Sequence, residues 1–270
     1  MSKNLQLWTL IFQTLILAAT LVSSYLLFAK HRDPKIYWSL GKNIAAVYVI
    51  IEVLLLLSWN AINAAIVMGL LHFLSIGLAL MCGFRLLRIL KLPAFIFLSP
   101  SSHSKKWRKK ISLGKFFTVS ILSAVFICVF TYILFKFTNP QVAPFLKEVP
   151  SALNSSPLSS IPKSVGLFFL LVAFYEEIIF RIFFQSVFRY LFRKISHAGP
   201  WAILATSALF AVGHFGILET WWIKLTQTFV IGLVLGALMN TYGFEASFLA
   251  HAILNIFALY ASKYFLPQMS

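Results

Sequence analysis

Acidic side chains are scarce in this chain, and charge of either sign is uncommon. Only 7 Asp and Glu residues stand against 23 Lys and Arg, and charged residues make up 11% of the 270. Hydrophobic residues make up 60%, and the mean hydropathy is +0.87. Soluble domains of this length carry far more charge, so the composition predicts a multi-pass membrane protein.

The basic excess does not indicate nucleic acid here. A net charge of +16 would suggest such a partner for a soluble protein, but these Lys and Arg residues lie in short connections between apolar runs. In that position they orient helices toward the cytoplasmic face of a membrane. The loop 85–115 alone holds nine of them. We expect it to attract anionic lipids, at about 1 kcal/mol per basic residue near the surface.

Cysteine is nearly absent, and two common hydrolase motifs are missing. The chain has only Cys82 and Cys128, both inside apolar runs, which excludes a disulfide framework and a C-x-x-C metal site. There is no G-x-S-x-G and no H-E-x-x-H. The usual signatures of serine hydrolases and of one large class of zinc proteases are therefore lacking.

Long apolar runs take the place of these features. Each is close to the length of about 20 residues that crosses the roughly 30 Å hydrocarbon layer. The predicted fold is therefore all-α, a polytopic membrane protein of about eight transmembrane helices with its N-terminus outside. The runs are Leu5–Ala29, Asn43–Trp59, Ala61–Phe84, Phe116–Phe135, Val165–Phe188, Pro200–Leu218, Ile223–Thr241 and Phe244–Tyr260.

Proline and serine gather in one segment, which divides the chain. Residues 138–163 contain five of the ten prolines and a run of serines, and no packed element tolerates that density of helix breakers. We interpret this segment as an external linker. It would separate an N-terminal membrane half of four helices, residues 1–137, from a C-terminal membrane half of four helices, residues 164–263.

Three of the few ionisable groups fall within one apolar run. Glu176, Glu177 and Arg181 lie in the predicted span Val165–Phe188, although a charge at the bilayer centre costs about 2.5–3.5 kcal/mol. Glu177 and Arg181 are four residues apart and share a helical face, so they are expected to pair. Glu176 is rotated by about 100° from Glu177. It is therefore the carboxylate left free for chemistry.

Two later spans also carry polar groups at membrane depth. His214 follows Phe210 by one helical turn, and His251 and Asn255 are four residues apart on one face. We expect these groups and Glu176 to converge on one intramembrane polar cavity. Counting residues from the inner ends of their spans puts the two histidines at depths that differ by roughly 10 Å, which helix tilt can absorb.

Two polar residues in the N-terminal half are interpreted differently. Glu52 and His72 lie within the second and third predicted spans. We expect buried side chains that form hydrogen bonds to a neighbouring helix, since polar groups join helices in this way inside membranes. A role in lining the cavity is the alternative.

The polar groups of the C-terminal half have a limited chemistry. A carboxylate and an imidazole can hold and deprotonate a water molecule, and a second imidazole and a carboxamide can donate hydrogen bonds to a developing oxyanion. Such a set can hydrolyse an amide. A divalent metal such as zinc is the alternative, because Glu176, His214 and His251 offer three N/O ligands with a position open for water. Asn255 would then lie outside the ligand shell.

Three short patterns carry a family resemblance. E-E-I-I-F-R, F-A-V-G-H and H-A-I-L-N resemble the motifs E-E-x-x-x-R, F-x-x-x-H and H-x-x-x-N/D of the CAAX prenyl endopeptidase and bacteriocin-processing family, also called CPBP or Abi intramembrane proteases. Their order and their placement on separate spans agree with that family. The resemblance covers roughly residues 165–262, and the N-terminal half shows no comparable motif.

The resemblance implies a role for each matching residue. Glu176 and His214 would activate water, and His251 and Asn255 would stabilise the oxyanion. Glu177 and Arg181, with the motif residue Phe210, would support the site. Members of the family have been described both as metalloproteases and as metal-independent glutamate proteases, so a metal cofactor stays open here.

The expected function is that of an intramembrane endopeptidase. Its substrate would be a membrane-anchored or lipidated protein, cut near the C-terminus or in a leader, and its location a bacterial plasma membrane. A non-catalytic scaffold or bacteriocin-immunity protein with the same fold is the main alternative, although such a protein would normally lose a catalytic group. An ion-coupled transporter is a third possibility, but the two halves show no inverted repeat.

Overall fold

A computed structural model describes residues 3–28, 34–58, 62–92, 111–140, 163–215, 218 and 220–265. Within these ranges the regular elements are all helices, which confirms the all-α prediction. They are α1 (Lys3–Phe28), α2 (Pro34–Ser58), α3 (Ile62–Ile89), α5 (Leu113–Thr138), α7 (Lys163–Glu177), the π-helix η2 (Ile178–Phe184), α8 (Gln185–Leu191), the short 3₁₀ turn η3 (Phe192–Lys194), α9 (Ala198–Gly213), α10 (Trp221–Tyr242) and α11 (Phe244–Phe265).

The predicted number of eight helices fits this architecture. α7, η2 and α8 follow one another without a break and together occupy the place of the single expected span Val165–Phe188. In the part of the chain that the structure describes, four segments are long and apolar enough to cross a membrane: Trp38–Ser58, Ile66–Ile89, Leu113–Thr138 and Trp221–Tyr242. Ile11–Leu27, Ala198–Gly213 and Phe244–Leu259 are shorter apolar helices.

Helix α5 shows why the outer surface suits a lipid environment. Its small and polar side chains, such as Ser120, Ala124 and Thr131, are buried against neighbouring helices. Leu122 and Phe126, by contrast, are exposed. Apolar groups on the outside would be unfavourable in water, but they match the hydrocarbon chains of a bilayer.

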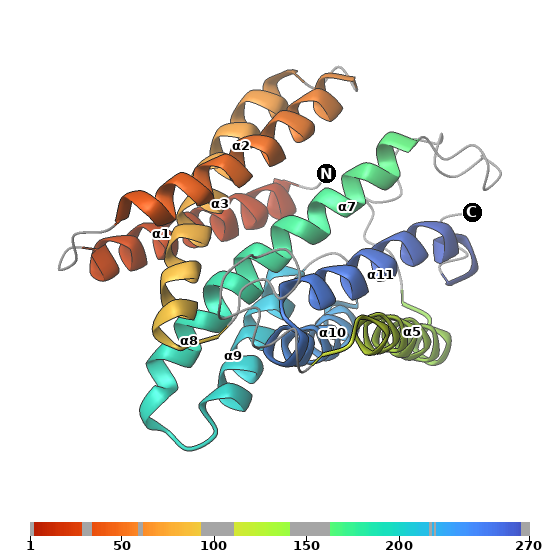
Figure 1. The fold of residues 1–270 in the computed structure, drawn as a ribbon. Helices are drawn as coiled ribbons and strands as arrows, with labels where there is room; N and C mark the ends of the chain where they lie inside the picture. Colours follow the sequence, from red (N-terminus) through yellow and green to blue (C-terminus); the bar gives the residue numbers. More distant parts are fainter. Residues whose placement is uncertain are drawn as a thin grey trace.

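Helices that pack together do not always come from the same half of the chain. α2 runs along α3, and α1 also packs on α3 (Figure 1). α5 lies against α10 and α11 rather than against these N-terminal helices (Figure 1). The division of the chain at residues 138–163 stays a prediction, and residues 141–162 of that linker and 93–110 of the basic loop lie outside the described ranges.

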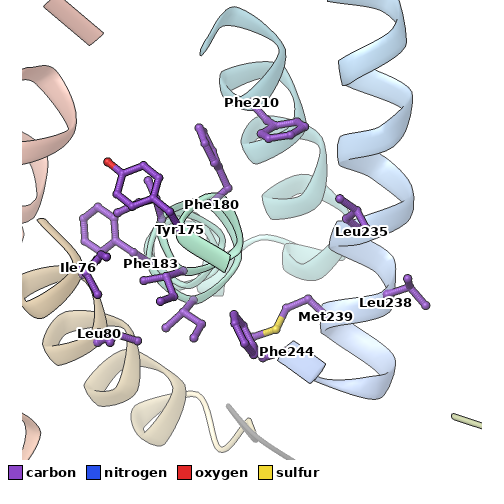
Figure 2. Close-up of a cluster of buried hydrophobic side chains, with 14 of the residues drawn as sticks. Ile76, Leu80, Tyr175, Phe180, Phe183, Phe210, Leu235, Leu238, Met239 and Phe244 are labelled. Carbon is purple, nitrogen blue, oxygen red and sulfur yellow. The ribbon is translucent and has the colours of Figure 1, made fainter. Parts of the chain in front are cut away.

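The core surrounds the segment from α7 through η2. Figure 2 shows side chains of α3, including Ile76 and Leu80, on one side of this segment, and Phe210 of α9 and Leu235 of α10 on the other. Ile178, Ile179, Ile182 and Phe183 of η2 are completely buried. The helix that carries the paired carboxylates is therefore the centre of the bundle.

A glycine allows α3 to approach the π-helix closely. A Cβ atom at Gly83 would lie 2.5 Å from the carbonyl oxygen of Ile182 and 2.5 Å from its Cγ2 atom. Any larger side chain would therefore push α3 away from the backbone of η2. π-helical turns are rare and are found frequently at functional sites. Here the turn begins at Ile178, directly after Glu177.

Candidate active site

The carboxyl group of Glu176 lies between two imidazole rings. Its Oε1 atom is 3.4 Å from Nε2 of His214, and its Oε2 atom is 3.4 Å from Nε2 of His251. Glu176 comes from the end of α7, His214 from the end of α9 and His251 from the middle of α11. The structure thus brings together the three residues that the sequence analysis placed in one cavity. The offset of roughly 10 Å that linear counting gave does not separate them.

His214 does not lie inside a helix, contrary to the expected span Pro200–Leu218. α9 ends at Gly213, and His214 is its C-cap residue, with φ −102° and ψ 10°. Its Nδ1–H group donates to the carbonyl oxygen of Phe210 at 2.8 Å. With Nδ1 committed to that carbonyl, Nε2 is the ring atom that faces Glu176. The cap conformation therefore gives the ring both a fixed tautomer and a fixed direction.

Glu177 has more partners than the sequence analysis predicted. It is completely buried, and its Oε2 atom is 3.5 Å from Nε of Arg181, one helical turn away. Its Oε1 atom accepts a hydrogen bond of 2.9 Å from Nδ1 of His251. The hydroxyl of Ser247 also donates to its Oε2 atom. Glu177 therefore orients His251 in the way that a carboxylate orients a histidine in many catalytic sites.

Phe210 packs against Arg181 and against both histidines of the site. The guanidinium carbon of Arg181 lies 5.1 Å from the centre of the Phe210 ring. The same ring contacts His214, with centroids 4.5 Å apart, and His251, with centroids 6.0 Å apart. An aromatic face stabilises a cation that has left water. Phe210 and Arg181 thus contact the residues of the site, and their supporting role stays a prediction.

Asn255 lies apart from this group. Its Nδ2 atom donates to the carbonyl oxygen of Phe169 at 3.2 Å. Phe169 precedes Glu176 by about two helical turns, or roughly 10 Å along α7. In this structure Asn255 joins α11 to α7, and its expected part in an oxyanion hole stays a prediction.

Two neighbours of the site were not predicted. Ser247 lies four residues before His251 on α11, and this spacing alone could have indicated a shared face. Lys224, in the first turn of α10, interacts electrostatically with Glu176 and donates to Oε1 of Gln227 at 2.9 Å. No sequence signal indicated Lys224, because its spacing from the motifs has no regular period.

The donor set for a metal is present. Glu176, His214 and His251 have suitable chemistry for zinc, and the two carboxyl oxygens of Glu176 face different rings. Within the described ranges, no group of three or more His, Cys, Asp or Glu side chains could hold a metal ion. The metalloprotease alternative is therefore not supported.

Comparison with known proteins adds one match. Residues 159–257 match a family model described as type II CAAX prenyl endopeptidase Rce1-like. No curated protein and no solved structure matched the chain. The matched segment contains all the site residues described above, from Glu176 to Asn255, whereas α1 to α5 lie outside it. The resemblance inferred from the three motifs is confirmed: residues 159–257 of this chain are similar to the CAAX prenyl endopeptidases.

Proposed function

We propose that this protein is an intramembrane endopeptidase that hydrolyses a peptide bond in a membrane-anchored or lipidated protein. One observation carries the proposal. Nε2 of His214, the C-cap residue of α9, and Nε2 of His251, in α11, each lie 3.4 Å from one oxygen of Glu176. In an apolar helix bundle such a concentration of ionisable groups is expensive, so it favours a catalytic purpose.

The geometry supports a water molecule held at both hydrogens. One hydrogen points to the Glu176 carboxylate and the other to the Nε2 lone pair of His214, which leaves the oxygen lone pair directed at the substrate carbonyl. Glu176 accepts the proton as the oxygen attacks the carbonyl carbon. The tetrahedral intermediate then collapses, the carbon–nitrogen bond breaks, and Glu176 returns the proton to the departing amine.

The remaining groups act on the charge that forms during this step. His251 is flanked by Glu176 and Glu177, and it can donate from Nε2 to the oxyanion when its ring carries both protons. Glu177 keeps that ring in place through Nδ1. Asn255 would need to leave the carbonyl of Phe169 to donate to the same oxyanion. We therefore assign it a smaller part than His251.

The family match supports a substrate with a lipidated C-terminus. A cut near that end, or in a leader peptide, is consistent with a site among membrane-spanning helices. The protein would then be a multi-pass component of its membrane, and a bacterial plasma membrane stays our prediction for its location.

A cleavage assay tests the proposal. The purified protein in nanodiscs is incubated with a fluorogenic peptide that carries a farnesylated cysteine near its C-terminus. We expect cleavage by the unmodified protein and its loss in Glu176→Gln and His214→Ala. Glu245→Gln and His197→Ala remove the same chemical groups outside the site and should cleave normally. A folded protein that cleaves neither this peptide nor a lipidated-leader peptide would favour the scaffold alternative.

A chelator separates the two protease types. The proposed reaction uses only groups of the protein, so 1,10-phenanthroline and EDTA should leave the cleavage rate unchanged. Loss of cleavage with the chelator and its recovery with added zinc would restore the metal alternative.

A further inference from the structure

A second buried acid–imidazole pair lies outside the segment that matches the family. Glu52 of α2 and His72 of α3 are both buried, and Nδ1 of His72 is 2.7 Å and 2.9 Å from the two carboxyl oxygens of Glu52. This confirms the expectation of polar residues that join neighbouring helices. The pair does more than join α2 to α3, however, because of what lies on the other face of the imidazole.

The ring of His72 packs on the residue that precedes Glu176. Its centroid is 4.4 Å from that of the Tyr175 ring. Tyr48 of α2 completes the group, 5.9 Å from His72 and 6.3 Å from Tyr175. Figure 2 shows Tyr175 on the same side of the central helix as Ile76 of α3 and away from Leu235 of α10. Tyr175 thus faces the N-terminal helices, whereas Glu176 faces α9 and α11.

The hydroxyl of Tyr175 is held as well as its ring. It donates to Oε1 of Gln13 on α1 at 2.6 Å. His72 of α3 and Tyr48 of α2 contact its ring. Three helices of the N-terminal part of the chain therefore hold this one side chain. Since each residue of an α-helix is rotated by about 100° from the next, fixing Tyr175 fixes the direction in which Glu176 leaves the helix.

The π-helix makes such an external hold necessary. η2 begins two residues after Glu176 and extends to Phe184, and its wider turns break the regular rotation that would otherwise link α7 to α8. Glu177 is held by three partners of its own. Glu176 has the two imidazoles at 3.4 Å and an electrostatic interaction with Lys224, and its side chain remains 18% exposed. Neither imidazole contact is as short as the 2.9 Å bond that holds Glu177, so the direction of Glu176 also depends on its neighbours on α7.

We propose that Glu52, His72 and Tyr175 form a positioning cluster that sets the direction of the Glu176 carboxyl group. Glu52 fixes the imidazole plane through Nδ1. This is the ring's single hydrogen-bonded edge, because Nε2 of His72 has no partner in the described part of the chain. The imidazole supports the Tyr175 ring, and Tyr175 fixes the adjacent carboxylate. These three are positioning residues and not catalytic ones, since none contacts the reacting water.

Enzyme kinetics provide the first test, which depends on the proposed function. Tyr175→Leu should lower kcat about tenfold or more with KM within about twofold, because a small displacement of a catalytic group slows the reaction without weakening substrate binding. Tyr175→Phe keeps the ring and should retain most of the rate. Glu52→Gln keeps a hydrogen bond to His72 and should be more active than Glu52→Leu. Ser24→Ala removes another buried polar contact between α1 and α3 and should leave kcat unchanged.

A cross-linking experiment tests the same cluster without any catalysis. In a background with Cys82→Ala and Cys128→Ala, cysteines replace Glu176 and His214, and a short bis-methanethiosulfonate reagent joins them in the folded protein. Adding Tyr175→Leu or Glu52→Leu should lower the cross-linking yield at least about twofold, because the two cysteines would then meet less often in the required geometry. Adding Thr131→Val, which removes a buried contact between α5 and α10, should not change it.

The two tests can fail separately. If the protein cleaves no substrate but Tyr175→Leu still lowers the cross-linking yield, the protease proposal is contradicted and the positioning cluster is supported. Normal cross-linking and normal kcat in folded Tyr175→Leu would overturn the cluster. So would a rise in KM at constant kcat, which would make these residues part of the substrate site.

Discussion

The protein contains two buried carboxylate–imidazole groups with opposite character. In the Glu52–His72 pair one carboxylate is matched to one ring at 2.7 Å, and both side chains are almost inaccessible. In the site, one carboxylate is shared by two rings at 3.4 Å, and the side chains of Glu176 and His214 are 18% and 17% exposed. A close pair with both side chains buried is closed to a substrate. A loose, shared one leaves room for water, and this difference separates the structural group from the reactive one.

The largest expected effect comes from making the same change in both groups. Glu176→Gln should lower the cleavage rate by about 10²–10⁴-fold, the usual contribution of general acid–base catalysis. Glu52→Gln should lower it only a few-fold, because the amide still accepts from His72. Steady-state rates on the farnesylated peptide measure both. If both variants fold and lose the same fraction of the cleavage rate, the distinction between a structural and a reactive group is wrong.

The next effect concerns the fully buried pair beside the site. Glu177→Gln leaves the Arg181 charge buried without its partner, which should cost about 3–5 kcal/mol of unfolding free energy. The double variant Glu177→Gln, Arg181→Met removes both charges and should recover part of that loss. Denaturant unfolding in mixed micelles compares the three proteins. If Glu177→Gln is fully stable and as inactive as Glu176→Gln, the division of labour between the two carboxylates is wrong.

A third prediction tests the contact through which the N-terminal helices reach the π-helix. Gly83→Ala places a Cβ atom against the backbone of Ile182 and should destabilise the protein by about 1–3 kcal/mol, as overpacking does. A Cβ atom at Gly114, near the start of α5, would meet no other atom within 4 Å, so Gly114→Ala serves as the matched control. Thermal unfolding followed by circular dichroism measures both. Equal melting temperatures for Gly83→Ala and Gly114→Ala would show that α3 can move away from η2 without loss of stability.

The smallest effect is expected at Ser247. Ser247→Ala removes a hydrogen bond to the Glu177 carboxylate, and such bonds to charged groups contribute about 1.5–3 kcal/mol. Because His251 and Arg181 remain, we expect the lower end of this range and a few-fold loss of rate. Thr131→Val, which removes a buried contact between α5 and α10, should cost stability without changing the rate per folded molecule.

Spacing along one helix was enough to predict part of the site. The Glu177–Arg181 contact follows from a separation of four residues, and so does the common face of His251 and Asn255. The rotation between Glu176 and Glu177 correctly separated His214, beside Glu176, from Arg181, beside Glu177. It did not indicate that His251 lies between the two carboxylates. Spacing and rotation are local rules of helix geometry, and they need no knowledge of tertiary packing.

The remaining features depend on contacts between distant parts of the chain. Tyr175 and Gln13 are 162 residues apart, and nothing local marks either one. The end of α9 at Gly213 and the π-turn after Glu177 are departures from regular periodicity, so counting residues could not find them. The family patterns likewise say nothing about α1 to α3, although these helices hold the residue next to Glu176.

The packing of α5 has a consequence for how the protein is made. α5 lies against α10 and α11, yet translation completes it roughly 80 residues before α10 begins. At about 5–20 residues per second, the ribosome needs on the order of 4–16 s to cover that interval. During this time the face of α5 that carries Ser120, Ala124 and Thr131 lacks the helices α10 and α11 that pack on α5 in the complete fold. In a membrane, α5 would therefore remain without its partner helices until the last fifth of the chain is made.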